Sequence, residues 1–321
     1  MRDAAGTLPA CLESLRAQTL EDFEVIAVDD GSLDASAAVL AGAAAGDRRL
    51  RVIAGGGGLV AALNAAAEAA TGELLARMDA DDVALPGRFA GQVARLEAEP
   101  ALDVLGCRVS VLDDGGEGNA GMRAYVDWSN TLLTHEAIAA DMLVESPLAH
   151  PSVMMRAQAL RGLGGYRAFA GPEDYDLWLR AFTAGCRFGK LPEVLLQWRD
   201  TPGRLSRTDA RYAADRFFEL KMQWFLRTWP PADAVVVWGA GPIGKAWARG
   251  LIAAGRAVRA FVEVDPRKIG QTIHGAPVVS VDEARGHRHG VHLAAVGLPD
   301  ARRRIRDAAA ALGVERLIAV A

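Results

Sequence analysis

Apolar and polar residues alternate in blocks along the first hundred positions. Residues 8–18 carry apolar side chains at helical spacing, and residues 23–28 form an apolar run that stops at Asp29 and Asp30. An apolar run that ends at acidic and small residues is typical of a buried strand leading into a loop. The pattern next predicts a strand, a helix and a strand at 50–54, 59–70 and 73–78. Strands that alternate with helices predict an α/β fold with a mostly parallel sheet.

The pattern is less regular between residues 100 and 200, and it becomes regular again near the C-terminus. It predicts strands or extended segments at 104–112 and 150–155 and helices at 175–184 and 211–229. The last helix ends at Pro230-Pro231, because proline cannot continue a helix. A new α/β rhythm follows, with strands at 234–238, 257–264, 291–296 and 316–320 and helices at 245–254 and 301–312. We therefore expect two domains, at residues 1–229 and 230–321.

Composition and charge exclude several classes of protein. The net charge of -4 provides no general basic field, so nucleic acid is not an expected partner. Cys11, Cys107 and Cys186 lack a C-x-x-C spacing, which argues against a disulfide scaffold or a thiolate zinc site. No signal-peptide pattern is present, and no apolar run approaches the roughly 20 residues of a membrane-spanning helix. We expect a cytoplasmic protein, with peripheral contact at the inner face of the membrane left open.

The strongest candidate for chemistry is the acidic sequence Arg77-Met78-Asp79-Ala80-Asp81-Asp82, which directly follows a predicted strand. Carboxylates two residues apart in a loop can converge on one divalent cation. Mg²⁺ and Mn²⁺ favour such oxygen ligands and also bind diphosphate oxygens. A bound cation neutralises the charge that grows on a departing diphosphate. Taken alone, the motif favours a solvated acidic turn, because such turns are common.

Several motifs in a fixed order resemble those of family-2 glycosyltransferases of the GT-A fold. They are Cys11-Leu12-Glu13-Ser14-Leu15 with Gln18-Thr19, Val28-Asp29-Asp30-Gly31-Ser32, Thr71-Gly72-Glu73, the acidic motif, Leu85-Pro86 with Arg88-Phe89, His150-Pro151-Ser152, Gly164-Gly165-Tyr166 and Glu173-Asp174-Tyr175-Asp176. The likeness covers about residues 2–225. It implies a mostly parallel sheet with helices on both faces. It also implies inverting transfer from a nucleotide-sugar donor to a glycan or lipid-linked acceptor, in cell-surface polysaccharide or glycolipid assembly.

The resemblance also implies roles for the donor site. Asp29 and Asp30 would contact the base or ribose of the donor. Asp79 and Asp81 would hold Mg²⁺ or Mn²⁺, and Asp79 with Arg77 would contact the ribose-diphosphate.

For the acceptor, the resemblance implies that Asp174 is the general base and that Glu173 supports it. One carboxylate base suffices because a metal-bound diphosphate leaves without a protonating acid. Acids in the first turn of a helix also stabilise the helix dipole, and the two roles are compatible. His150 is expected either to contact donor or acceptor or to be a buried structural histidine.

One departure from the family concerns the start of the chain. The family begins with a hydrophobic strand, and here Met1 falls where that strand would be ending. Either the start codon lies too far downstream or the domain is truncated. Both readings predict a gap or an exposed edge beside residues 25–29, with poor solubility or weak donor binding.

The second domain carries Gly239, Gly241 and Gly244 in a G-x-G-x-x-G pattern between a predicted strand and helix. Glu263 and Asp265 end the next strand, as in a dinucleotide-binding fingerprint. The domain resembles the Rossmann-like domains that precede sugar O-acetyltransferases. A bound nucleotide or dinucleotide and a purely structural or docking role are both compatible with the pattern.

Two other functions compete with glycosyl transfer. An NAD(P)-linked oxidoreductase would be centred on the glycine fingerprint, but it lacks a visible proton donor and leaves most of the chain unexplained. A non-catalytic protein that binds sugar nucleotides would account for the absent first strand.

Overall fold

The computed structural model describes residues 1–113, 120–201, 203–230 and 233–321, and its contacts divide the chain into two compact units. The first unit holds Met1–Ile138 and Pro147–Ala213, and the second holds Ala139–Ser146 and Ala214–Ala321. Helix α10 (Ala214–Thr228) is grouped with the second unit, whereas the sequence places the boundary after this helix. Pro231 lies outside the described residues. The division at 229/230 stays a prediction.

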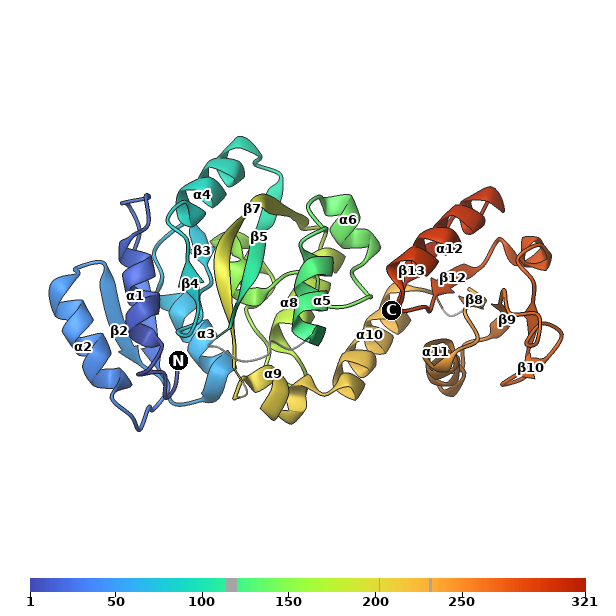
Figure 1. Cartoon of the computed structure of the whole chain (residues 1–321), viewed down its shortest axis with the longest axis horizontal. Helices are drawn as coiled ribbons and strands as arrows, with labels where there is room; N and C mark the ends of the chain where they lie inside the picture. Colours follow the sequence, from blue (N-terminus) through green and yellow to red (C-terminus); the bar gives the residue numbers. More distant parts are fainter. Residues whose placement is uncertain (114–119, 202, 231–232) are drawn as a thin grey trace. The chain divides into compact units, whose positions relative to one another are not determined.

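The first unit begins with a two-stranded parallel sheet. Strand β1 (Val25–Asp29) pairs with β2 (Leu50–Ala54). The adjoining helices are α1 (Leu8–Arg16), α2 (Ser36–Gly46) and α3 (Gly58–Ala69), which Figure 1 shows beside this pair. Apolar side chains of α1, α2 and β2 form its core, with Leu40 completely buried. The alternation of apolar and polar blocks in the sequence therefore predicts this layer correctly.

The edge of β1 opposite β2 confirms the break expected beside residues 25–29. Among the strands that the structure describes, none pairs with this edge. Met1 lies along it instead. The Met1 amino group donates to the carbonyl oxygen of Val28 at 2.7 Å, and the Asp30 amide donates to the Met1 carbonyl oxygen at 2.9 Å. The expected effects on solubility and donor binding stay predictions.

A five-stranded sheet with the order β3-β6-β5-β7-β4 makes up the rest of the first unit. The strands are β3 (Leu74–Ala76), β4 (Val83–Ala84), β5 (Leu102–Asp113), β6 (Met154–Arg156) and β7 (Arg187–Asp200). The long strands β5 and β7 are parallel, and the short strands β6 and β4 run against their neighbours. The helices of this part are α4 (Arg88–Ala98), α5 (Ala120–Ser129), α6 (His135–Ala140), α7 (Ala157–Gly162), α8 (Glu173–Thr183) and α9 (Leu205–Thr208).

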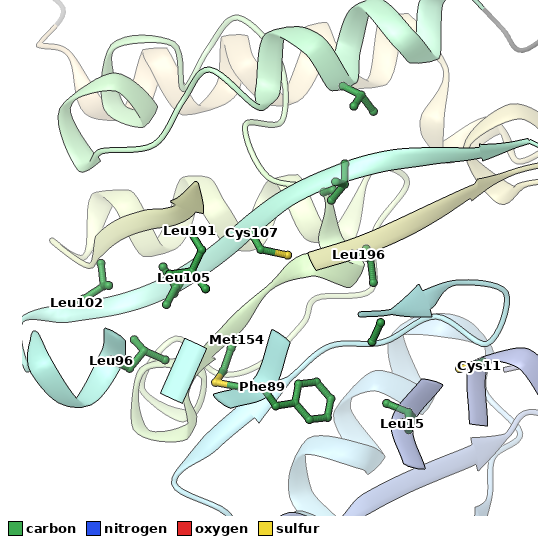
Figure 2. Packing of buried hydrophobic residues seen from close by; sticks show 14 residues of the cluster. Cys11, Leu15, Phe89, Leu96, Leu102, Leu105, Cys107, Met154, Leu191 and Leu196 are labelled. Atoms are coloured by element: carbon green, nitrogen blue, oxygen red, sulfur yellow. The ribbon is translucent and has the colours of Figure 1, made fainter. Parts of the chain in front are cut away.

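The main hydrophobic core lies against β5 and β7. Figure 2 shows Leu105 and Cys107 of β5, Phe89 and Leu96 of α4 and Met154 of β6 within one cluster that extends to α1. Leu96 is completely buried. Burial of such side chains is the main favourable contribution to folding, at about 1.5–3 kcal/mol for each large aliphatic group. The core holds in place α1 and α4, and both helices contact the segment between β3 and β4.

Two predicted elements differ from the structure. His150–Ser152 form a 3-10 turn, so the extended segment predicted at 150–155 is wrong there. The Ser152 amide and hydroxyl both donate to the Ala149 carbonyl, which closes the turn. The helix predicted at 211–229 is interrupted at Ala213, whose backbone is extended. Its remaining part, α10, is the longest helix of the described residues at 15 residues. Within the described ranges, no helix combines the length and apolar character needed to cross a membrane.

The second unit contains a six-stranded sheet with the order β10-β11-β9-β8-β12-β13. Its elements are β8 (Val235–Trp238), α11 (Pro242–Ala253), β9 (Val258–Val262), β10 (Thr272–Ile273), β11 (Ala276–Val279), a 3-10 turn (Glu283–His287), β12 (Val291–Ala294), α12 (Pro299–Ala311) and β13 (Leu317–Ala319). All pairs except β10–β11 are parallel. The order reverses between β8 and β12, which is where doubly wound folds bind ligands.

Candidate active site

An acidic loop between β3 and β4 places three carboxylates together. One oxygen from each of Asp79, Asp81 and Asp82 lies within 4.8 Å of the other two. Asp82 is buried, and its Oδ1 accepts a hydrogen bond from the Arg199 amide at 2.8 Å. In the described part of the chain, Asp82 Oδ2 is buried and has no hydrogen-bond partner. A buried carboxylate oxygen without a partner is costly unless a cation or a proton occupies the site.

The electrostatics of this loop favour a cation. Burial raises the pKa of Asp82 well above its ordinary value, and the charges of Asp79 and Asp81 raise it further. Burial and Asp79 likewise raise the pKa of Asp81. Burial opposes the ionisation of Asp79, but Arg77, whose Nη2 lies 2.5 Å from Asp79 Oδ1, lowers its pKa. Three oxygen donors that repel one another fit a hard divalent cation such as Mg²⁺ or Mn²⁺. Asp82, which the sequence analysis did not include among the ligands, belongs to this set.

Buried side chains of helix α1 and of the residues just after it hold the acidic loop in place through hydrogen bonds. Cys11 and Ser14 lie one turn apart on α1, and Gln18 follows the C-terminal end of the helix. The Cys11 thiol donates to the Asp79 carbonyl at 3.3 Å, and Ser14 Oγ accepts from the Ala84 amide at 3.1 Å. Gln18 Nε2 donates to the Ala84 carbonyl at 3.3 Å. The motif that carries the family resemblance therefore positions the loop, a role that spacing alone does not reveal.

Helix α4 holds the strand that enters the loop. Arg88 is completely buried, and its Nη2 donates to the Arg77 carbonyl at 2.7 Å. Arg88 Nε donates to Gln92 Oε1, and Gln92 Nε2 donates to the carbonyl oxygens of Leu105 and Ser152 at 2.9 Å each. The backbone before Asp79 is thus tied to β5 and to the turn at His150.

The predicted general base lies at the start of helix α8. Glu173 and Asp174 form the first turn after Pro172. Glu173 is buried, and its Oε2 accepts a hydrogen bond from the Tyr212 hydroxyl at 2.6 Å. Asp174 is half-buried, and its Oδ1 accepts from the Tyr175 amide at 2.8 Å. Glu173 thus faces the protein interior, whereas Asp174 is the more accessible carboxylate of the pair.

His150 is buried next to the first turn of α8. Its Nε2 is 2.9 Å from the Tyr166 hydroxyl, and its Nδ1 is 3.9 Å from Glu173 Oε1. Asn64 holds Tyr166 through two hydrogen bonds to its backbone, each 2.9 Å long. This burial supports the structural role for His150, and direct contact with donor or acceptor stays a prediction. Leu63-Asn64 and Gly164-Gly165-Tyr166 both belong to the motifs that resemble the family, but the sequence did not reveal that Asn64 and Tyr212 are supports.

Arg77 links the acidic loop to Tyr166 and Glu173. Burial lowers the pKa of Arg77, but the negative charge of Asp79, together with Tyr166 and Glu173, raises it above its ordinary value. Arg77 therefore stays charged and interacts with both Asp79 of the acidic loop and Glu173 of α8. The structure brings the predicted donor-binding, metal-binding and catalytic residues into one region of the first unit.

Asp29 and Asp30 lie at the end of β1. Asp29 Oδ1 accepts from the Ser32 amide and hydroxyl, and Asp30 Oδ1 accepts from the amides of Gly57 and Gly58 at 3.1 and 3.2 Å. Within the described residues, the second oxygen of each carboxylate accepts no hydrogen bond. These two oxygens are available to the hydroxyl groups of a ligand, as the predicted ribose contact requires.

The buried His150 predicts a dependence of stability on pH. Burial, followed by the charge of Arg77, lowers its pKa from 6.5 to about 3. Below about pH 6.5, His150 binds a proton in the unfolded chain but stays neutral in the folded protein. The free energy of unfolding therefore falls by roughly 1.4 kcal/mol per pH unit until the pH reaches the pKa of His150 in the folded protein. In urea denaturation, we expect His150→Gln to lose stability less steeply than the wild type between about pH 6 and 4. Equal slopes would contradict the neutral, buried state.

The three glycines of the G-x-G-x-x-G turn in the second unit differ in the space around them. A Cβ on Gly244 would lie 2.0 Å from the Gly239 carbonyl oxygen, and one on Gly239 would lie 2.8 Å from Val296 Cγ1. These two glycines are therefore needed for packing. A Cβ on Gly241 meets nothing within 4 Å. Gly241 borders an open pocket of about 460 Å³ lined by Ala240, Gly241, Pro242, Lys245, Arg249 and Lys268.

The two acids predicted to contact a ribose have protein partners. Glu263 Oε2 accepts from the Ala240 amide and from Lys268 Nζ, both at 3.0 Å. Asp265 pairs with Arg267 at 2.9 Å. Contact of either acid with a ligand stays a prediction.

Comparison with known proteins supports the same assignment. Residues 2–164 match the family described as Glycosyl transferase family 2, and residues 232–318 match the CoA binding domain. The putative glycosyltransferase EpsE of Bacillus subtilis is 33% identical over 215 residues, which cover 65% of this chain and 74% of EpsE. The amylovoran biosynthesis glycosyltransferase AmsE of Erwinia amylovora is 32% identical over 200 residues, which cover 62% of this chain and 72% of AmsE.

A solved structure shares the fold. It is the mannosyltransferase PcManGT from Pyrobaculum calidifontis in complex with GDP-Man and Mn²⁺, with a TM-score of 0.52 and 16% identity over 97% of this chain and 78% of that chain. The predicted α/β fold class of the GT-A type is confirmed, except that the five-stranded sheet is mixed, with antiparallel pairs at β3–β6, β5–β6 and β4–β7. The Glycosyl transferase family 2 match spans just over half of the chain and includes the acidic loop. The chain belongs to glycosyltransferase family 2 and is a sugar-transferring enzyme.

Proposed function

We propose that this glycosyltransferase moves a sugar from a nucleotide-sugar donor to an acceptor hydroxyl with inversion, in a reaction that requires Mg²⁺ or Mn²⁺. The observation that carries the proposal is the convergence of three carboxylates within 4.8 Å, with Asp79 and the half-buried Asp174 both close enough to Tyr166 to interact with it electrostatically. The name of AmsE, a relative in amylovoran biosynthesis, supports polysaccharide assembly as the setting.

Asp79 and Asp81 would hold the cation, with Asp82 as a third oxygen donor beside them. A bound cation supplies neutralisation of the negative charge on the diphosphate as it departs. The protein prepares this site by keeping Arg77 against Asp79, so that the triad does not carry three uncompensated charges. The neighbour PcManGT, solved with Mn²⁺, supports a divalent ion at such a site.

Asp174 would take the proton from the acceptor hydroxyl while the acceptor oxygen forms its bond to the anomeric carbon. The bond from that carbon to the diphosphate oxygen breaks on the opposite face, and the configuration inverts. Glu173 holds the Tyr212 hydroxyl at 2.6 Å and so fixes the turn from which Asp174 acts. The free oxygens of Asp29 and Asp30 suit the ribose hydroxyls, and Arg77 suits the diphosphate.

A panel of nucleotide sugars tests this proposal directly. We expect at least one donor to raise the melting temperature in Mn²⁺, because a ligand that binds only the folded state stabilises it by mass action. The same donor in EDTA is the control and should have no effect. If every donor leaves the melting temperature unchanged in Mn²⁺, the proposed function is wrong.

We also propose that the pocket beside Gly241 binds a nucleotide or dinucleotide through its phosphate groups. Lys245 and Arg249 lie on successive turns of α11 beside the turn, and Lys268 completes a basic lining. The match of residues 232–318 to the CoA binding domain supports a nucleotide-like ligand.

Gly241→Asp is a sharp test of this pocket, because an added Cβ meets no protein atom within 4 Å there and the fold should persist. We expect calorimetric titration with CoA, NAD⁺ or NADP⁺ to show binding to the wild type and a loss of at least about tenfold in the variant, because the new carboxylate repels phosphate. Absence of binding in the wild type, or equal binding in both, would favour the structural role.

A further inference from the structure

Arg204 follows strand β7 and carries a charge of the kind that several nearby arginines neutralise in ion pairs. Arg77 pairs with Asp79, Arg207 pairs with Asp200, and Arg211 pairs with Asp209. Among the described residues, no carboxylate lies within ion-pair distance of Arg204. An arginine that has no acidic partner of its own beside a cluster of acids is available to an anionic ligand.

The place of Arg204 is fixed by an aromatic support. Its guanidinium carbon lies 4.3 Å from the centroid of the Trp198 ring, which is a cation–π arrangement. Trp198 in turn packs against Tyr125, with ring centroids 5.9 Å apart. Arg204 Nη1 also contacts Met122 Sδ at 3.7 Å. An arginine stacked on a ring keeps the edge of its planar fork free for hydrogen bonds.

The support lies next to the acidic loop. Strand β7, which carries Trp198, pairs with β4 so that Gln197 faces Val83. Just beyond this pair, the Arg199 amide donates to Asp82 Oδ1 at 2.8 Å, and Arg199 Nε donates to the Asp81 carbonyl at 2.7 Å. The end of β7 is thereby tied to the loop that would hold the cation.

The charge of Arg204 also reaches the triad. Arg204 interacts electrostatically with Asp79, Asp81 and Asp82. Arg204 is thus close enough to influence all three carboxylates, although it pairs with none of them.

We propose that Arg204 is a further donor-binding residue, which contacts the diphosphate of the nucleotide sugar through its guanidinium group while Trp198 holds it in place. The inference rests on the nucleotide-sugar-dependent transfer proposed above. A guanidinium offers two parallel N–H donors to phosphate oxygens, and this pairing is among the stronger hydrogen bonds in proteins. With Arg204 in this role, positive charge faces the leaving diphosphate from the protein as well as from the cation.

The test separates a diphosphate contact from simple neutralisation of the triad. Binding of UDP, GDP, dTDP and CDP in Mn²⁺ is measured by calorimetry for the wild type, Arg204→Gln and Arg204→Lys. Binding of Mn²⁺ alone is measured by electron paramagnetic resonance. We expect Arg204→Gln to weaken the preferred nucleoside diphosphate by about tenfold or more, the scale of one charge-assisted hydrogen bond, and Arg204→Lys to recover part of the loss. Mn²⁺ alone should bind the variant at least as tightly as the wild type, because a repelling charge is removed.

Arg49→Gln is the matched control. Arg49 also stacks on an aromatic ring, at 4.5 Å from the centroid of Phe23, but it pairs with Asp47 and belongs to the β1–β2 layer. Its replacement should leave nucleoside diphosphate affinity unchanged. The inference is overturned if Arg204→Gln binds the nucleoside diphosphate as well as the wild type, or if it loses Mn²⁺ affinity to the same degree. If the wild type binds none of the four nucleotides in Mn²⁺, the proposed function itself fails and the role of Arg204 fails with it.

Discussion

Asp81→Ala is expected to abolish measurable sugar transfer and metal-dependent donor binding while the protein remains folded. Asp81 contributes one of the three oxygens that lie within 4.8 Å of one another, and two remaining carboxylates cannot hold the cation in the same place. Transfer is measured as release of the nucleoside diphosphate over a range of Mn²⁺ concentrations. Asp79→Ala should have the same effect and should also leave Arg77 without its closest partner.

A stability measurement without metal distinguishes this role from a structural one. Burial and the charge of Asp79 both raise the pKa of Asp81, so its ionised form is disfavoured in the metal-free protein. We therefore expect the melting temperature of Asp81→Ala in EDTA to equal or exceed that of the wild type. Asp300→Ala, which removes an exposed acid paired with Arg303, serves as the control for activity. Unchanged turnover of Asp81→Ala at saturating Mn²⁺ would refute the metal assignment.

Asp174→Asn is expected to lower the transfer rate by roughly 10²-fold or more, the usual scale for a lost general base. The amide preserves the shape of the side chain and can still accept the hydrogen bond from the Tyr175 amide, so the start of α8 should persist. Donor affinity, measured in Mn²⁺ by calorimetry, should remain within a few fold of the wild type.

The comparison of rate with affinity decides the role of this residue. If donor affinity falls together with the rate, Asp174 binds the donor and another group is the base. Glu173→Gln is the informative companion, because Glu173 is buried and accepts the Tyr212 hydroxyl. A glutamine retains this hydrogen bond, and we expect a smaller loss of rate than in Asp174→Asn.

Local sequence predicts the chemistry of the acidic loop but not its supports. A strand followed by Asp79 and Asp81 predicts a metal site, because ligand type and spacing are local properties. The hydrogen bonds that join Ser14 and Gln18 to Ala84 cannot be predicted locally. They depend on which side of α1 meets the loop, and the packing of α1 on the core decides this. Arg204 was missed for the same reason, since its position depends on the pairing of β7 with β4.

Strand β7 shows why the pattern of apolar and polar residues does not predict every element of the fold. Pro192 and Glu193 interrupt its apolar residues, and proline within a run normally argues against a strand. In the structure the register shifts at this point, so that Cys107 faces Leu191 and Arg108 faces Val194. The two interrupting residues bulge from the pairing, and the strand continues beyond them. Periodicity cannot reveal such a bulge because the partner strand lies more than eighty positions earlier.

The stereochemistry of the first transfer product tests the central claim most directly. In a single displacement assisted by Asp174, the acceptor attacks opposite the departing diphosphate, so the anomeric configuration of the transferred sugar must be opposite to that in the donor. Proton NMR of the anomeric resonance and its coupling constant, recorded on product formed in Mn²⁺, gives this configuration. We predict an inverted product, and a product with the configuration of the donor would contradict the mechanism proposed for Asp174.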